Sequence, residues 1–293
     1  MFQSRFLLAH KKIRGKVSMS DGPSLQSEVT HEVRPIQYAH ALDVADRLHE
    51  PVPAPCILDL ETAYAVQREF VELRRARLGS ERVGYKVALT SPEAQAALKA
   101  SEPASGELLS SDVRASGSEI DIDSLFCPLI EVEVMFRVAR ELPRSATFAE
   151  VVASCEVAAG LECPDGRYQR WFGGDFPALS KYDVISDNCL AGIVIVNNGW
   201  IPAREIDLST TTAELWIDGG VIASGPGTDV LGNPVNSIVW LSQQLAGRGQ
   251  VLATGAIISS GTYTSPVVAH VGSIVANFGP QLGQVSVQFT KRT

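Results

Sequence analysis

Histidine is scarce in this chain of 293 residues, and its placement limits the catalytic sites that the chain can build. Only His270 lies in the β-rich region after residue 81, and the others are His10, His31, His40 and His49. A histidine-centred triad or a zinc site is therefore not expected. The sequence also lacks HExxH, a Gly-x-Ser-x-Gly elbow between strand and helix, GxGxxG after a strand, and GxxxxGK(S/T). Any catalysis should then depend on carboxylates, a lysine and a hard metal ion.

Positive charge and long apolar runs are also in short supply. The chain has 25 Lys and Arg against 33 Asp and Glu, which gives a net charge of −8 and a pI near 5.2. This balance argues against a nucleic-acid partner. The longest apolar runs, 191–197 and 251–258, are far too short to span a bilayer, so we expect no membrane partner.

The cysteines are few and unpaired in sequence. There are five, none in a CxxC pair: Cys56, Cys127, Cys155, Cys163 and Cys189. An odd, scattered set is neither a disulfide framework nor a zinc ribbon, and it fits small buried residues in a reducing compartment. We therefore expect a cytoplasmic protein.

The N-terminus is basic, with no acidic residue before Asp21. Such a segment can be a transit peptide, but a disordered extension, with Met19 as the true start, is the favoured interpretation. We expect residues 1–34 to form an extension, residues 35–80 a helical N-terminal region, and residues 81–293 a β-rich catalytic domain.

Hydrophobic spacing predicts the fold class. Residues 37–50 and a segment from Asp59 or Thr62 to Leu78 are typical of amphipathic helices, and further helices are expected at 91–100, 147–153 and 234–246. Asp218-Gly219-Gly220 is a hairpin signal. Strands are predicted at 83–89, 129–138, 155–162, 190–197, 211–217, 255–260 and 284–290. The expected class is α+β, with a mixed, mostly antiparallel β architecture and peripheral helices.

Two glutamates stand out within a predicted strand. Glu131 and Glu133 occupy alternate positions in Leu129-Ile-Glu-Val-Glu-Val-Met-Phe136, so they should project from one face about 6.5–7 Å apart. Like charges held so close in an apolar setting need a positive partner, and Mg²⁺ or Mn²⁺ suits paired carboxylates. The alternative is an exposed strand face whose glutamates are solvated.

Other polar residues occur in β-like or glycine-flanked settings, each with an ordinary alternative. Lys86 is unusual in a strand but can be an edge lysine. Asp112 can point into a cleft or form a turn, and Glu162 could complete a three-carboxylate site. Asp187-Asn188 can be a plain turn, and the segment 261–266 can offer backbone N–H groups or be a loop.

Taken in order, seven segments resemble the 2-keto-4-pentenoate hydratase group of the fumarylacetoacetate hydrolase superfamily. The resemblance covers roughly residues 35–290. The segments are Gly84-Tyr-Lys-Val-Ala-Leu-Thr90, Gly106-x-Leu-Leu-x-x-Asp112, Ile130-Glu-Val-Glu-Val134, Gly160-Leu-Glu162, Asp183-Val-Ile-Ser-Asp-Asn188, 231–241 and Gly283-Gln-Val-Ser-Val-Gln-Phe289. Departures from the group's pattern at 162–177, 260–266 and 270–273 bear on the length and polarity of the substrate's tail.

The resemblance implies a β-roll or barrel of the fumarylacetoacetate hydrolase C-terminal type and a homo-oligomer. It implies Mg²⁺ or Mn²⁺ as the cofactor, and we name a pathway decarboxylase or aldolase as the expected protein partner. The implied site residues are the metal ligands Glu131, Glu133 and Glu162, the catalytic pair Lys86 and Asp112, and the substrate contacts Leu109, Asp187, Asn188, Gly261 and Thr262.

The implied activity is addition of water to a 2-hydroxy-2,4-dienoate, which gives a 4-hydroxy-2-oxo acid in aromatic meta-cleavage catabolism. A 4-oxalocrotonate-type decarboxylase, or an acylpyruvate C–C hydrolase, would use the same metal site and is the alternative. A hypothesis of a different class is a non-catalytic scaffold that keeps a structural divalent cation.

Overall fold

The structure is a computed structural model that describes residues 35–55, 57, 59–172 and 179–291. The expected extension, residues 1–34, lies outside the described residues. Residues 33–293 form one compact unit, and the description below concerns that unit. Among the described residues, no helix has the length and apolarity needed to cross a membrane.

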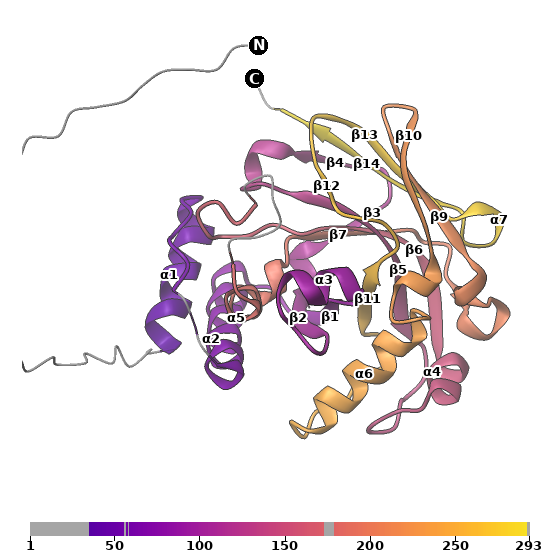
Figure 1. Ribbon diagram of the computed structural model, residues 1–293, viewed down its shortest axis with the longest axis horizontal. Coiled ribbons are helices and arrows are strands. Elements are labelled where there is room, and N and C mark those ends of the chain that lie inside the picture. Colours follow the sequence, from indigo (N-terminus) through magenta and orange to yellow (C-terminus); the bar gives the residue numbers. More distant parts are fainter. Residues whose placement is uncertain (1–34, 56, 58, 173–178, 292–293) are drawn as a thin grey trace, which may run out of the picture. The chain divides into compact units, whose positions relative to one another are not determined.

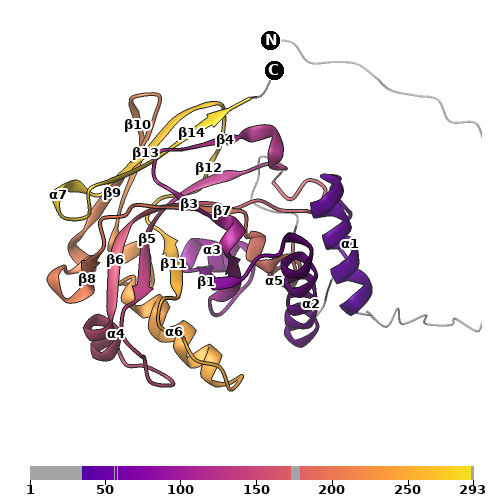
Figure 2. The same cartoon turned by 180° about the vertical axis from the view of Figure 1, so that it is seen from behind.

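Helices and two sheets make up a mixed α+β fold (Figure 1). The predicted helices are confirmed, and α5 and α7 were not predicted. The α-helices are α1 (Pro35–Leu48), α2 (Leu60–Leu78), α3 (Pro92–Ala97), α4 (Phe148–Ser154), α5 (Lys181–Ser186), α6 (Val235–Ala246) and α7 (Gly279–Leu282). The first two lie side by side (Figures 1 and 2). Asp59 caps the start of α2 by accepting a hydrogen bond from the Thr62 amide, and Gly79 ends it in the left-handed conformation.

The larger sheet has nine strands and contains the segments of most interest. Its order is β2 (Ala104–Leu109), β1 (Arg82–Ala88), β11 (Ile257–Thr262), β5 (Leu129–Val138), β6 (Cys155–Cys163), β7 (Ile193–Val196) and β3 (Val113–Ala115), with β12 (Val267–Val268) on β5 and β8 (Ile201–Pro202) on β6. The pairs β1–β11 and β3–β7 are parallel, and the others are antiparallel. The larger sheet is curled and not flat (Figure 2).

A five-stranded sheet packs on the larger one, where β13 and β14 contact β6. Its order is β10 (Gly220–Pro226), β9 (Thr212–Ile217), β13 (Gly272–Asn277), β14 (Gln284–Thr290) and β4 (Ser118–Asp121). The predicted hairpin is confirmed, because β9 and β10 pair antiparallel across Asp218 and Gly219, both with positive φ. The mostly antiparallel architecture is therefore confirmed, whereas the closed roll or barrel stays a prediction.

Two departures from the predicted strands have clear local causes. The strand expected at 190–197 begins only at Ile193, because Asn188, Cys189 and Leu190 all have positive φ and form a turn. Four strands that were not predicted have only two to four residues, too few for an alternating pattern to be recognised: β3, β4, β8 and β12. The strands β2 and β13 were also not predicted.

Gly84 allows β1 to lie close to β11 and so sets the register at Lys86. The two strands pair Gly84 with Ile257 and Lys86 with Ser259. A Cβ atom added at Gly84 would lie 1.7 Å from the carbonyl oxygen of Ile257, which is backbone and cannot rotate away. The absence of a side chain at this position is therefore a condition for the β1–β11 pairing.

We predict that Gly84→Ala destabilises the fold by at least about 1–3 kcal/mol, because the strands must separate to admit the methyl group. Chemical denaturation of the purified variant measures this. Gly247→Ala is the matched control, since its added Cβ would make only an ordinary contact, 3.5 Å from the Gln244 oxygen. Equal unfolding free energies for both variants would contradict the assigned register.

Candidate active site

Three glutamates meet where β5 and β6 pair. Glu131 lies directly opposite Glu162 in the antiparallel register, and Glu133 follows two residues along β5. One carboxylate oxygen from each lies within 4.8 Å of the other two. Glu133 and Glu162 are buried and Glu131 is half-buried, so the alternative of a solvated strand face is wrong.

Lys86 supplies a positive charge to this cluster. Its side chain is buried, and its Nζ donates a hydrogen bond to Glu162 Oε1. Burial alone would lower the pKa of Lys86, but the charges of Glu162 and Glu131 outweigh it and raise the pKa to about 12. Lys86 is therefore a buried, charged ammonium and not a strand-edge lysine in water.

One lysine does not balance three carboxylates. Burial, followed by the charge of Glu162, raises the pKa of Glu131 to about 8, although Lys86 opposes this. Burial and the other two glutamates also hold the pKa of Glu133 well above its usual range. This occurs even though Glu133 Oε2 accepts hydrogen bonds from Ser259 Oγ (2.5 Å) and the Gly261 amide (2.8 Å). Without a cation these two carboxyl groups therefore tend to keep their protons, and a bound cation would favour their ionised form.

A divalent cation fits the donor set. Among the described residues, Glu162 Oε2 is buried without a hydrogen-bond partner, so one oxygen of the cluster is available as a ligand. Hard cations such as Mg²⁺ and Mn²⁺ prefer carboxylate oxygens. Glu131, Glu133 and Glu162 are the residues that would hold it.

The cluster opens into a cavity of about 970 Å³. Lys86, Gly261 and Thr262 line the cavity together with the three glutamates, so four strands contribute these polar residues to it: β1, β5, β6 and β11. Gly261 has φ +114, and a Cβ there would lie 2.2 Å from Thr90 Oγ1, which explains glycine at this position.

Asp112 lies elsewhere. It is buried at the end of the 3₁₀ turn η1 (Ser110–Asp112) and does not line the cavity. Both of its oxygens accept hydrogen bonds from Arg74 Nη1 on α2, at 2.8 and 2.9 Å, and Oδ2 also accepts one from the Leu109 amide. Leu109 is likewise buried outside the cavity lining. These contacts attach α2 to β2, and the catalytic role of Asp112 stays a prediction.

Asp187 and Asn188 are buried beside the cavity but do not line it. Asp187 accepts hydrogen bonds from the Arg167 amide (2.7 Å) and Nη1 (2.9 Å), while burial raises the pKa of Asp187 to about 6 despite that arginine. The Asn188 side chain bonds both the N–H and the C=O of Glu107 on β2. Their backbone leads into Cys189 and Leu190, which do line the cavity.

Sequence reasoning missed Arg74 and Arg167, which hold these carboxylates in place. Arg167 is buried and also binds Asp46 of α1 at 3.1 Å and the Ala191 carbonyl oxygen. Its only sequence signal is a position in Cys163-Pro-Asp-Gly-Arg167, a stretch in which a charged residue is usually exposed. The helix α3, which covers part of the cavity, was predicted as a helix but not as part of the site.

The chain is similar to curated proteins over most of its length. A 2-oxo-hept-4-ene-1,7-dioate hydratase of Escherichia coli is 34% identical over 257 residues, which is 86% of this chain and 96% of that protein. The chain belongs to the 2-keto-4-pentenoate hydratase group of the fumarylacetoacetate hydrolase superfamily. No family model matches the sequence.

Other members of the hydratase group agree. A 2-keto-4-pentenoate hydratase of Burkholderia vietnamiensis is 29% identical and covers 80% of this chain and 87% of its own. A TodF product hydratase of Pseudomonas putida is 32% identical over 80% of this chain and 85% of its own. These relatives make the chain an enzyme, a hydratase-like carbon–oxygen lyase, and they speak against a non-catalytic scaffold.

Solved structures show the same fold. The 4-oxalocrotonate decarboxylase from Pseudomonas putida G7, complexed with magnesium and adipate, matches with a TM-score of 0.80 and 26% identity, over 87% of this chain and 97% of that chain. Fumarylpyruvate hydrolase from Pseudomonas aeruginosa, in complex with Mn²⁺ and pyruvate, shares the fold at 14% identity and a TM-score of 0.53, over 72% and 90%.

We predict that Glu162→Gln weakens Mn²⁺ binding by about 100-fold or more, because loss of even an outer partner of a metal ligand costs 10–100-fold. Isothermal titration calorimetry on the metal-stripped protein measures this. Glu156→Gln is the matched control, since Glu156 lies on the same strand but pairs with Arg137 outside the cavity. Unchanged Mn²⁺ affinity in Glu162→Gln would remove this residue from the ligand set.

For Asp112→Asn we expect a loss of about 1–3 kcal/mol of stability, because Arg74 loses its charged partner, and turnover of the folded variant tests the catalytic role separately. Thermal denaturation and steady-state kinetics on the same preparation separate the two effects. Full stability together with a collapse of kcat would instead establish Asp112 as catalytic.

Proposed function

We propose that this enzyme adds water to a 2-hydroxy-2,4-dienoate, in a metal-dependent reaction that yields a 4-hydroxy-2-oxo acid in aromatic meta-cleavage catabolism. The observation that carries the proposal is the meeting of three glutamates and a charged lysine in one cavity. The hydratase names of the similar proteins support it.

The reaction requires two proton movements and one new C–O bond. A proton reaches C5 of the dienol while the C2 hydroxyl loses its proton, which gives a 2-oxo-3-enoate. The oxygen of water then bonds to C4. The proton released from that water is transferred to C3, where the negative charge of the enolate has developed. The product contains the substrate plus one water.

The chain's residues have distinct parts in this proposal. A divalent cation held by the three glutamates, Mg²⁺ or Mn²⁺, would supply Lewis acidity toward the 2-oxo acid end of the substrate. Lys86 keeps its proton at Nζ at neutral pH, so it acts as a hydrogen-bond donor and a fixed positive charge where negative charge develops on oxygen. Lys86 and Asp112 were expected to handle protons together, and of the two only Lys86 lines the cavity.

A second candidate is decarboxylation of a 4-oxalocrotonate-like acid. The observation in its favour is the similarity to the magnesium-containing 4-oxalocrotonate decarboxylase. C–C hydrolysis of an acylpyruvate ranks third, because no histidine among the described residues lines the cavity to activate water. All three reactions would use the same three glutamates.

Several further expectations belong to this proposal. We propose that the enzyme is a cytoplasmic homo-oligomer, and that a decarboxylase or aldolase of the same pathway is its partner. We also propose that the curled sheet belongs to the roll or barrel of the fumarylacetoacetate hydrolase type, and that residues 35–80 and 81–293 act as a helical region and a catalytic domain.

The direct test is metal-dependent loss of dienoate absorbance with 2-hydroxypenta-2,4-dienoate. We expect rapid loss with Mg²⁺ or Mn²⁺, formation of 4-hydroxy-2-oxopentanoate, and no reaction in EDTA. Lys86→Met should lower kcat/KM by about 10²–10³-fold, the usual effect of removing one oxyanion-stabilising donor. Lys291→Met, at an exposed lysine paired with Asp123, is the control. Metal binding without dienoate loss would shift the assignment to the decarboxylase.

A further inference from the structure

The charges that line the cavity are strongly one-sided. Among the described residues, its lining contains five carboxylates and one lysine, and the two carboxylates outside the metal cluster, Glu93 and Asp229, are exposed. The lysine, Lys86, is already paired with Glu162. A divalent cation at the three glutamates would still leave this described lining with more negative than positive charge. Within it, positive charge for an anionic group of the substrate is therefore available beside the metal and Lys86 alone.

The remaining wall is largely apolar and comes from several elements. The apolar lining residues include Leu89, Leu98, Leu129, Trp171, Val184 and Leu190. Leu98 and Val184 are buried, as are Leu129 and Trp171. A substrate tail that leaves the metal cluster therefore meets mostly hydrocarbon and aromatic surface. The polar groups of this wall are neutral, such as Trp171 Nε1 and Thr264 Oγ1, which are buried without a partner, so a distal carboxylate would find hydrogen-bond donors but no cation among the described lining residues.

The cavity also exceeds what a five-carbon acid needs. About 970 Å³ lies at the upper end of the range, about 300–1,000 Å³, found for cavities that enclose drug-sized ligands. The volume thus leaves room for a tail beyond the dienoate, and the wall determines the chemistry of that tail.

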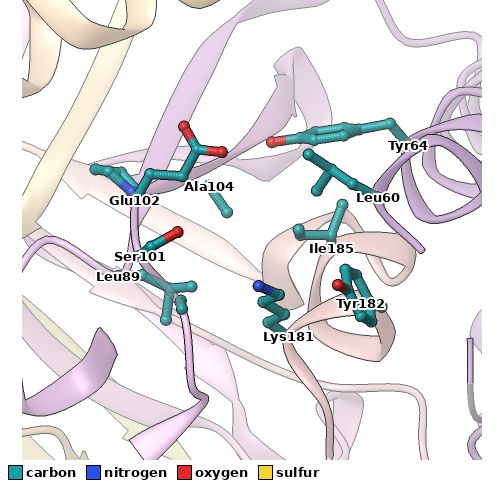
Figure 3. Close-up of a pocket in the computed structure, with 11 residues that line it drawn as sticks. Leu60, Tyr64, Leu89, Ser101, Glu102, Ala104, Lys181, Tyr182 and Ile185 are labelled. Carbon is teal, nitrogen blue, oxygen red and sulfur yellow. The ribbon is translucent and has the colours of Figure 1, made fainter. Parts of the chain in front are cut away.

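Lys181 is another source of positive charge near the large cavity. It lines a separate, small pocket of about 90 Å³ between α2 and α5, and Leu89 is the one described residue that lines both hollows. Figure 3 shows Lys181 beside Tyr182 and Ile185, with Leu89 and Glu102 on other sides of the same pocket. Lys181 therefore belongs to a hollow that shares only Leu89, among the described residues, with the large cavity.

We infer that the preferred substrate is a monocarboxylic 2-oxo acid whose tail beyond the dienoate is uncharged and apolar, either alkyl or aryl. The inference rests on the proposed function for the site but concerns only the tail. It distinguishes this chain from the Escherichia coli relative, whose name specifies a 1,7-dioate.

The test compares two unreactive ligands of matched shape, 2-oxo-7-methyloctanoate and 2-oxoheptane-1,7-dioate. They differ in that an isopropyl group replaces the distal carboxylate. Calorimetric titration of the Mg²⁺-loaded enzyme gives both dissociation constants. We expect the monoacid to bind at least about tenfold more tightly, because only the diacid places a charge against the apolar wall. Equal binding, or tighter binding of the diacid, would overturn the inference, as would failure of the monoacid to bind.

Two variants identify the cause. Asp229→Lys should reduce the discrimination by about two- to fivefold, the size of an exposed charge interaction, whereas Glu205→Lys, at an exposed carboxylate outside the cavity, should leave it unchanged. If the wild-type enzyme favours the diacid and Lys181→Met removes that preference, the small pocket is a carboxylate subsite and the inference is wrong.

The tail inference and the hydratase assignment fail separately. The two unreactive ligands have dienoate counterparts that the enzyme could hydrate, 2-hydroxy-7-methylocta-2,4-dienoate and 2-hydroxyhepta-2,4-diene-1,7-dioate. We would measure kcat/KM for both. Tight monoacid binding without turnover of any dienoate would refute the hydratase and keep the neutral tail. Turnover of both dienoates with equal kcat/KM would keep the hydratase assignment and refute the neutral tail.

Discussion

Repulsion among three carboxylates on two adjacent buried strands is the constraint on which this site depends. Glu131 and Glu162 face each other across β5 and β6, where opposed like charges destabilise a sheet. The pairing is otherwise well supported, since β5 and β6 are buried along almost their whole length. The fold therefore holds the carboxylates together, and Lys86 offsets only part of their charge. The same arrangement that is costly without a cation is a preformed site for one.

A second group of charges holds the wall of the cavity in place. Arg167 joins Asp46 of α1 to Asp187, and Arg74 joins the same Asp46 to Asp112. Burial alone would raise the pKa of Asp46, but these two arginines and a hydrogen bond from Arg77 lower it well below its ordinary range. The left-handed turn at residues 188–190 comes immediately after Asp187 in the chain. This network thus links the helices to the backbone that carries Cys189 and Leu190 into the cavity.

The sequence was informative where a local pattern determines the outcome. The spacing of Glu131 and Glu133 in an apolar run identified a buried, two-carboxylate strand, and the Asp59 and Gly79 signals identified the ends of a helix. Partners distant in sequence could not be found in this way. Nothing local shows that Arg167 reaches Asp46, 121 residues away, or that Asp112 lies against Arg74. The resemblance implies site roles for Asp112, Asp187 and Asn188, and these roles stay predictions. In the structure the three side chains bond Arg74, Arg167 and the Glu107 backbone, respectively.

The structure divides the cavity into two parts with different chemistry. One part contains the charged residues, the three glutamates and Lys86. The 2-oxo acid end of the substrate fits this part whether the reaction is hydration, decarboxylation or C–C hydrolysis. The other part is an apolar wall, to which α3 and the segments near Trp171 and Leu190 contribute. Because the three reactions share the first part, the three glutamates and Lys86 cannot by themselves select among them. The wall bears on the substrate's tail instead, because a carboxylate beyond the reacting carbons meets no second cation among the described lining residues. This holds for a dioate substrate of a hydratase, such as the one named for the Escherichia coli relative, as it does for a 4-oxalocrotonate-like acid. The tail and the reaction are therefore separate questions in this cavity, and the apolar wall answers only the first.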